Sequence, residues 1–283
     1  MYKTLIDAEP LSQHLMDPNW VILDCRHDLL NPDFGRSAFE EGHIQNAQFA
    51  SIDNDLSGAK MGADGVFRGR HPLPDRAALI EALRRFGISD SSQVVAYDGQ
   101  GSMYAARAWW LLRWIGHEAV AVLDGGLGAW TAAGHPVVTP VAARSRGNIA
   151  ERHTLTRTVA VSDLVENLST RRYQVVDARA NDRFRGENET IDPVGGHIPG
   201  AKNRFFKDNL AADGRFRDAA SLKAAFAPFG APAQAVMQCG SGVTACHNLL
   251  AMEIAGLHGA ALYGGSWSEW CSNPARPVAT GPV

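Results

Sequence analysis

The stretch Trp20-Val21-Ile22-Leu23-Asp24-Cys25-Arg26 has a counterpart in Tyr173-Gln174-Val175-Val176-Asp177-Ala178-Arg179, later in this chain of 283 residues. Two other stretches recur in the same order: Gly42–Ala47 as Gly196–Ala201, and Gly116–Trp130 as Gly256–Trp270. Separate stretches that recur in a fixed order are the signature of an internal repeat. The sequence therefore predicts a tandem duplication.

The two copies are not of equal length. The third pair of stretches lies about fourteen residues closer together than the second pair, which places an insertion in the first copy, around residues 51–74. Residues 136–158 contain prolines and arginines with little hydrophobic periodicity, as expected of a linker. We expect a first domain over residues 1–145 and a second over residues 146–283.

Each copy alternates short apolar runs with helical patterns. The runs at 21–23, 94–97 and 235–238 predict strands, whereas the stretches 161–168 and 243–255 predict helices. Alternating strands and helices form a mostly parallel sheet with helices on both faces. The predicted fold class is therefore α/β, with two such domains in tandem, and ligands are expected at the carboxyl ends of the strands.

Composition limits the classes of partner. The formal net charge of −3 and the pI near 6.4 give no general attraction to nucleic acid or to an anionic membrane. No apolar stretch has the length of a signal peptide or a membrane helix, so we expect a cytoplasmic protein with a small-molecule or protein partner. The four cysteines form no CxxC pair and no zinc-like spacing, which predicts free thiols.

One cysteine stands in a distinctive setting. Cys239 follows the apolar run 235–238 and precedes a predicted helix, so it lies on a turn from strand to helix. Gly240 and Gly242 allow successive backbone N–H groups to point at the sulfur, which stabilises a thiolate or the outer sulfur of a persulfide. A buried structural thiol is the alternative. A cysteine phosphatase would need an arginine at position 245, where this chain has alanine.

These features resemble the tandem rhodanese family, and within it the 3-mercaptopyruvate sulfurtransferase branch. The resemblance spans nearly the whole chain, and its motifs are Asp177–Arg179, Arg183–Gly186, Gly196–Ala201, Cys239–Ala245 and Gly264–Trp270. In that family the second domain is catalytic and the first has lost its cysteine. Residues 97–102, Tyr-Asp-Gly-Gln-Gly-Ser, agree with this pattern because they contain no thiol.

The resemblance also implies substrate-binding residues. The small, neutral side chains of Val243 and Thr244, with Gly240 and Gly242, suit 3-mercaptopyruvate, whereas relatives that use the thiosulfate dianion carry basic side chains after the cysteine. Arg185 is expected to bind the donor's carboxylate, and a solvated surface arginine is the alternative. Family members often supply a second arginine shortly afterwards, but residues 187–193 of this chain contain none.

Three further residues are expected to act in catalysis. By resemblance, Asp53 and His71 match a proposed proton relay to the loop serine, here Ser241. The two relay residues are eighteen positions apart, and exposed loop side chains are the alternative. The resemblance implies no metal and no organic cofactor.

The predicted activity is a sulfur transfer. Sulfane sulfur would pass from 3-mercaptopyruvate through a Cys239 persulfide to a thiol, to cyanide or to a thioredoxin-like protein, with release of pyruvate. The alternatives are a thiosulfate:cyanide sulfurtransferase and a carrier of sulfane sulfur without turnover. The pair Asp177 and Arg179 recurs as Asp24 and Arg26 in the copy without the cysteine, so we expect it to be a structural ion pair.

Overall fold

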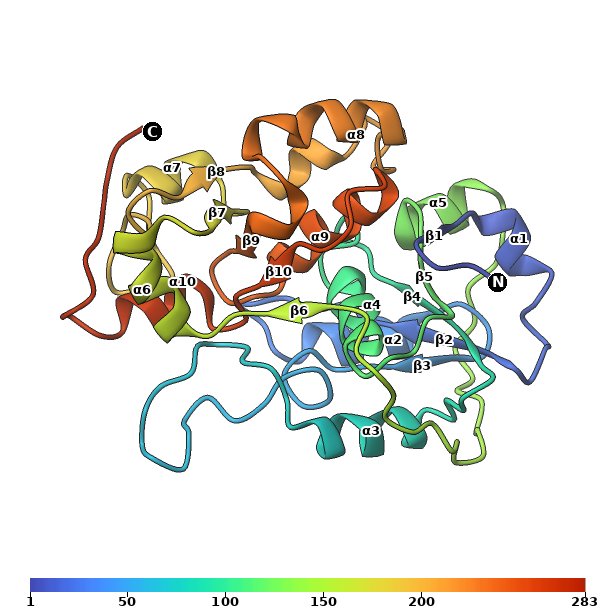
Figure 1. The fold of residues 1–283 in the computed structure, drawn as a ribbon. Coiled ribbons are helices and arrows are strands. Elements are labelled where there is room, and N and C mark those ends of the chain that lie inside the picture. Colours follow the sequence, from blue (N-terminus) through green and yellow to red (C-terminus); the bar gives the residue numbers. More distant parts are fainter. Residues whose placement is uncertain (283) are drawn as a thin grey trace. The chain divides into compact units, whose positions relative to one another are not determined.

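Each repeat forms a five-stranded sheet in the computed structural model, which describes residues 1–282 (Figure 1). The strand order is β1-β5-β4-β2-β3 in the first sheet and β6-β10-β9-β7-β8 in the second. All the strand pairs described are parallel. Strands at the same place in the two orders are related by the repeat, which confirms the predicted α/β fold in tandem.

The secondary structure follows the repeat closely. The first copy contains β1 (Leu5–Ile6), α1 (Ala8–Ser12), β2 (Trp20–Asp24), α2 (Phe34–Glu41), β3 (Ala47–Phe49), α3 (Arg76–Arg85), β4 (Gln93–Tyr97), α4 (Ala105–Trp114), β5 (Val120–Leu123) and α5 (Gly126–Ala132). The second contains β6 (Arg157–Thr158), α6 (Val161–Thr170), β7 (Gln174–Asp177), α7 (Asn181–Arg185), β8 (Lys202–Asn203), η1 (Phe206–Asn209), α8 (Ala219–Phe226), η2 (Ala227–Phe229), η3 (Pro232–Gln234), β9 (Ala235–Gln238), α9 (Thr244–Ile254), β10 (Ala261–Leu262) and α10 (Ser266–Cys271). Within residues 1–282, no helix is both long enough and apolar enough to cross a membrane.

The chain folds into two compact units that are not two uninterrupted halves. The first unit comprises Met1–Ser57, Pro74–Leu155 and Ala212–Phe216, and the second comprises Gly58–Leu73, Thr156–Ala211 and the chain from Arg217 onward. Residues 58–73 belong to the first repeat in sequence and pack with the second repeat in space. This exchange decides which residues can meet Cys239.

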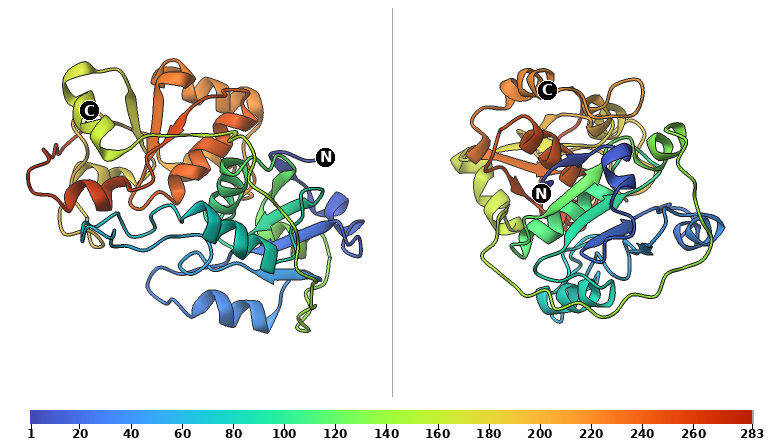
Figure 2. Two further views of the ribbon diagram at one scale, coloured as in Figure 1. Left: turned by 60° about the horizontal axis from the view of Figure 1, so that its bottom comes forward. Right: turned by 90° about the vertical axis from the view of Figure 1, so that its right-hand side faces the viewer.

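Helices cover both faces of each sheet. In the first unit, α1, α2 and α5 pack on one face around Ile22, Val95 and Trp130, and α4 contacts β4 and β5. In the second unit, α6, α7 and α10 pack around Val236 and Trp270, while α9 contacts β9 and β10. Figures 1 and 2 show α8 and α9, in orange, on the opposite side of the second sheet from α6 and α10. Strand residues therefore point alternately into two apolar layers.

The Asp-x-Arg pair makes the same contacts in both units. Arg26 binds the carboxylate of Asp24 and donates from Nη2 to the carbonyl oxygen of Gly42 at 2.7 Å. Arg179 binds Asp177 in the same way and donates to the corresponding glycine oxygen at 2.6 Å. Because the contact recurs in the unit without the cysteine, the prediction of a structural ion pair is confirmed.

The recurring histidines are also structural. His43 donates from Nδ1 to the carbonyl oxygen of Phe39 at 2.7 Å and stacks on that ring with 3.9 Å between the ring centroids. His197 makes the same bond to Phe184 at 2.9 Å and stacks on it at 3.8 Å. The backbone of each histidine also forms a bridge, that of His43 with Val138 and that of His197 with Ala279, and no described contact joins either side chain to the cysteine loop introduced below.

Candidate active site

Cys239 lies at the carboxyl end of β9, in the loop of residues 239–244 that we call the cysteine loop. The residue is 1% exposed, and its Sγ accepts a hydrogen bond from the backbone N–H of Gly242 at 3.1 Å. Gly242 has φ +81°, a left-handed conformation that favours glycine, and this turn directs its N–H back to the sulfur. The loop then enters α9, whose amino end adds a positive field near the sulfur.

The first unit shows what such a loop can hold. Asp24 pairs with Tyr97 in the first sheet, as Asp177 pairs with Gln238 in the second, so the residue after Tyr97 occupies the place of Cys239. That residue is Asp98. A second contact supports this correspondence between Asp98 and Cys239. In each unit, the carbonyl oxygen of that residue accepts a hydrogen bond from the N–H of the second residue in the helix that follows the next strand. A carboxylate therefore occupies the position that the thiol occupies in the other unit.

The Asp98 carboxylate is held by the backbone of its own loop. Oδ1 accepts from the N–H groups of Gln100 and Ser102 at 2.8 and 2.9 Å, and Oδ2 accepts from those of Tyr104 and Ala105 at 2.8 and 2.9 Å. Burial raises the pKa of Asp98, and these four hydrogen bonds oppose that shift. A strand-to-helix loop of this protein thus provides enough converging N–H groups to surround a buried anion.

The other cysteines lack this setting. All four thiols are free and buried. Burial raises the pKa of Cys25 well above its usual value and that of Cys271 to about 11, so both stay protonated near neutral pH and are poor nucleophiles. Cys246 lies inside α9, where its thiol donates to the carbonyl oxygen of Gly242 at 3.3 Å.

Ser241 of the cysteine loop is hydrogen-bonded to His71. The Nδ1 of His71 lies 2.9 Å from the Oγ of Ser241, and the two residues are 4% and 8% exposed. Both belong to the second unit, because residues 58–73 pack there. A buried histidine bonded to a loop hydroxyl can exchange a proton with it, as the predicted relay requires.

Two contacts place His71 next to the cysteine loop. The backbone N–H of Arg70 donates to the Oγ of Ser268 at 3.1 Å. Gly69, with φ +107°, passes so close to Gly265 that a Cβ on it would lie 2.7 Å from the carbonyl oxygen of Gly265. Ser268 in turn donates its backbone N–H to the carbonyl oxygen of Gly240 at 2.9 Å, so residues 69–71 and the loop share one support.

Asp53 lies in the first unit. Its Oδ2 is 3.9 Å from the Nδ1 of His27, a buried side chain that packs edge-on against the ring of Tyr104. Asp53 and His71 fall in different units, and the part of Asp53 in a proton relay stays a prediction.

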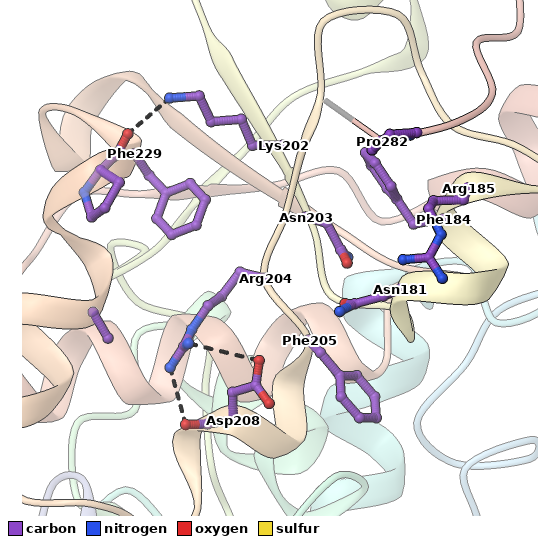
Figure 3. Close-up of a pocket in the computed structure, with 12 residues that line it drawn as sticks. Asn181, Phe184, Arg185, Lys202, Asn203, Arg204, Phe205, Asp208, Phe229 and Pro282 are labelled. Carbon is purple, nitrogen blue, oxygen red and sulfur yellow. Dashed lines mark hydrogen bonds and ion pairs between the residues drawn. The ribbon is translucent and has the colours of Figure 1, made fainter.

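Arg185 does not contact the cysteine loop among the described residues. Its guanidinium pairs with Glu187, from Nε and Nη2 at 2.8 Å each, and its side chain is 34% exposed. It lines a cavity of about 490 Å³, and Figure 3 shows it beside Phe184 on one side, with Lys202 and Phe229 on the other. The cavity is lined by Asn181, Phe184, Arg185, Lys202, Asn203, Arg204, Phe205, Asp208, Ala225, Pro228, Phe229 and Pro282. Binding of the donor's carboxylate by Arg185 thus stays a prediction that this geometry does not favour.

Two other arginines lie beside the loop instead. A Cβ placed on Gly240 would lie 2.7 Å from the Nη2 of Arg70 and 3.7 Å from the Nη2 of Arg183. Arg183 stands two residues before Arg185 in α7, and residues two apart on a helix point about 200° away from each other. Arg183, and not Arg185, therefore lies beside the loop, and the helical phase that selects between them cannot be assigned from the sequence.

The chain is similar to known proteins over almost its full length. The Rhodanese-like domain family matches residues 7–133 and 160–273. A Pseudomonas aeruginosa protein named "Probable 3-mercaptopyruvate sulfurtransferase" is 45% identical over 281 residues, which cover 98% of each chain, and the thiosulfate sulfurtransferase of Mus musculus is 32% identical over 95% of this chain and 92% of its own. The solved 3-mercaptopyruvate sulfurtransferase of Leishmania major superposes with a TM-score of 0.82 at 28% identity, covering 95% of this chain and 74% of that one. This chain belongs to the rhodanese family, as a tandem-domain member of its 3-mercaptopyruvate sulfurtransferase branch.

Proposed function

We propose that this protein is a 3-mercaptopyruvate sulfurtransferase that carries sulfur as a persulfide on Cys239. The observation that carries the proposal is the cysteine loop, in which Sγ accepts the N–H of Gly242 and whose counterpart in the first unit surrounds the Asp98 carboxylate. The similarity to the Pseudomonas aeruginosa relative supports the choice of donor. Neutral Val243 and the small Gly240 support it as well, because they leave room for a donor that brings its own thiol.

In the first half-reaction the Cys239 thiolate attacks the sulfur of 3-mercaptopyruvate. A sulfur–sulfur bond forms and the carbon–sulfur bond breaks, and the electron pair of the broken bond moves into the adjacent carbonyl group as the enolate of pyruvate. The enolate takes up one proton and leaves as pyruvate. The outer sulfur of the persulfide would then lie among the N–H groups of the loop and the amino end of α9, which favour its negative charge.

In the second half-reaction an acceptor attacks the outer sulfur. A thiol acceptor leaves as its persulfide and cyanide leaves as thiocyanate, and in both cases Cys239 returns as the thiolate. We propose a small thiol or a thioredoxin-like protein as acceptor, and the cytoplasm as the compartment. The four free cysteines support a reducing compartment.

The test of this function is the choice between two donors. With purified protein and a reductant, we expect kcat/KM for pyruvate release from 3-mercaptopyruvate to exceed kcat/KM for thiocyanate formation from thiosulfate and cyanide by at least about tenfold, a free-energy preference of about 1.4 kcal/mol. The physical reason is that Val243 and Thr244 add no cation to those of Arg70 and Arg183, whose charges are offset by Asp192 and Glu189. The reverse preference would make the protein a thiosulfate sulfurtransferase, to which the Mus musculus relative points. No turnover with either donor would leave a sulfur carrier.

We further propose that Ser241 and His71 deliver the proton that converts the enolate into pyruvate. Support comes from the 2.9 Å hydrogen bond between them, which places a titratable ring next to a hydroxyl of the cysteine loop. The histidine is buried, so the bond is shielded from competing water. Asp53 is proposed, on the family resemblance alone, to support the charge of the imidazole.

Replacement of His71 by alanine is expected to lower kcat for pyruvate formation by roughly 10- to 100-fold and to leave KM within about twofold. Ser241→Ala should have a similar effect, and the double variant should be no slower than either single variant because both remove one relay. His258→Ala serves as the matched control, since His258 is exposed in the same unit and pairs with Glu253. Normal kcat in His71→Ala would exclude the relay, and normal kcat in Asp53→Asn would remove Asp53 from it.

A further inference from the structure

Arg70, which lies beside the cysteine loop, belongs to residues 58–73, the segment of the first repeat that packs with the second unit. Gly240 has no side chain, and this opening is where the Nη2 atoms of Arg70 and Arg183 lie, at 2.7 and 3.7 Å from the position of a Cβ. The two guanidinium groups therefore stand next to the residue that follows Cys239. Both arginines belong to the second unit.

Carboxylates hold both arginines in place. The Nη1 of Arg70 pairs with the Oδ1 of Asp192, and the Nη2 of Arg183 lies 3.4 Å from its Oδ2. Arg183 also donates hydrogen bonds to the carboxylate of Glu189, from Nε at 3.1 Å and from Nη2 at 2.9 Å. The side chains of Asp192 and Glu189 are each only 3% exposed, so these contacts are shielded from solvent.

The Nε–H group of Arg70 is a hydrogen-bond donor without an acceptor among residues 1–282. This Nε is buried, and the side chain as a whole is 18% exposed. A buried N–H without an acceptor is unfavourable, and native proteins rarely leave one unless a ligand or water completes it. Here the unsatisfied donor belongs to the arginine that lies against Gly240, one residue from Cys239.

The charged side chains around the loop balance one another, so a donor anion would be held there by directed hydrogen bonds and not by a net positive charge. Arg70, Arg183 and Arg179 face the carboxylates of Asp192 and Glu189, while Asp177 is paired with Arg179. Burial is the main cause that raises the pKa of Asp192, and the nearby Arg70 opposes the shift. A planar guanidinium with a free edge suits a carboxylate, which accepts two parallel hydrogen bonds, better than it suits a spherical ion.

We propose that Arg70 binds the carboxylate of the sulfur donor, as the second cation beside Arg183, and that Asp192 is the positioning residue that holds its guanidinium over Gly240. This inference rests on the proposed function for the identity of the donor. It supplies from the first repeat the second arginine that residues 187–193 lack. A carboxylate bound there keeps the sulfur of the donor close to Sγ, since Gly240 directly follows Cys239.

The experiment compares two reagents that alkylate Cys239 and differ only in charge. Iodoacetate carries a carboxylate and iodoacetamide a neutral amide, and the rate of each is followed by mass spectrometry of the peptide that contains Cys239. We expect Arg70→Met to lower the ratio of the iodoacetate rate to the iodoacetamide rate by about tenfold, and Arg70→Lys to restore part of it because the charge remains. Alkylation needs no sulfur transfer, so the ratio of the two rates tests whether Arg70 binds a carboxylate even if the protein shows no turnover.

Arg68→Met is the matched control, because Arg68 lies in the same segment, is 42% exposed and pairs with Asp64. It should keep the wild-type ratio. Gly240→Ala provides a second variant should Arg70→Met fail to fold, since the added methyl group displaces only the mobile end of Arg70 and should lower the ratio too. In turnover, Arg70→Met should raise KM for 3-mercaptopyruvate at least about tenfold with kcat within about threefold. A wild-type alkylation ratio in folded Arg70→Met or Gly240→Ala would overturn the proposal.

Discussion

Replacement of Cys239 by serine is expected to lower pyruvate formation from 3-mercaptopyruvate by at least about a thousandfold. The hydroxyl of serine is a far weaker nucleophile than a thiolate and cannot form a persulfide. The fold should tolerate the change, because a hydroxyl oxygen can still accept the N–H of Gly242 that now points at Sγ. The measurement is the rate of pyruvate release under saturating donor, together with the thermal unfolding curve of the variant.

Cys271→Ser is the matched control for this prediction. Cys271 lies in α10 of the same unit and is also buried, but burial raises its pKa to about 11 and keeps the thiol neutral. We expect turnover within about twofold of wild type, since a protonated thiol contributes no nucleophile. If Cys239→Ser still released pyruvate well above the rate without protein, the sulfur would not be carried on Cys239.

The second large effect is expected for Gly242→Ala, which should lower the free energy of unfolding by about 3 kcal/mol. Two costs combine at this position. Its φ of +81° is unfavourable for an alanine, and the new Cβ would lie 2.3 Å from the carbonyl oxygen of Gly264, a backbone atom that cannot easily move away. Because the N–H of Gly242 would shift as the loop opens, turnover should fall along with stability.

Gly256→Ala separates these two costs. Gly256, directly after the C-cap residue of α9 in the same unit, also has a positive φ, +71°, but a Cβ there would meet no atom within 4 Å. We expect it to cost about 1 kcal/mol and to leave turnover unchanged. The difference in urea-induced unfolding between the two variants then measures the collision alone, and equal losses of stability would refute the close contact with Gly264.

The repeat made most of the fold predictable. Runs such as 21–23, 94–97 and 235–238 became β2, β4 and β9, because central strands buried on both faces leave a continuous apolar signal. The edge strands β1, β3, β6 and β8 are only two or three residues long, too short to leave any periodic pattern. Their positions follow from pairing with a central strand, which is a tertiary property.

The site was predictable only where its chemistry is local. The setting of Cys239 depends on adjacent residues, so the strand, the two glycines and the helix could be recognised together. The choice between Arg183 and Arg185 depends on the rotation of a five-residue helix, and no sequence pattern of that length fixes a rotation. Arg70 approaches Gly240 across about 170 positions of sequence, and only the folded chain reveals such a contact.

The role of Asp98 illustrates the same limit in the first unit. Alignment by sequence placed residues 97–102 opposite the cysteine loop and showed that they contain no thiol. Only the strand register placed a carboxylate at the position of Cys239, and only the hydrogen bonds to its oxygens revealed an occupied anion loop.

The exchange of residues 58–73 between the repeats has a consequence for the history of this chain. A gene fragment that encodes only residues 146–283 would contain Cys239. It would lack Arg70, His71 and Gly69, the glycine that packs against Gly265. Loss of the first copy would therefore also remove the residues proposed to bind the donor and to deliver the proton. The repeats are two in sequence, but on these proposals they can be inherited only as one functional gene.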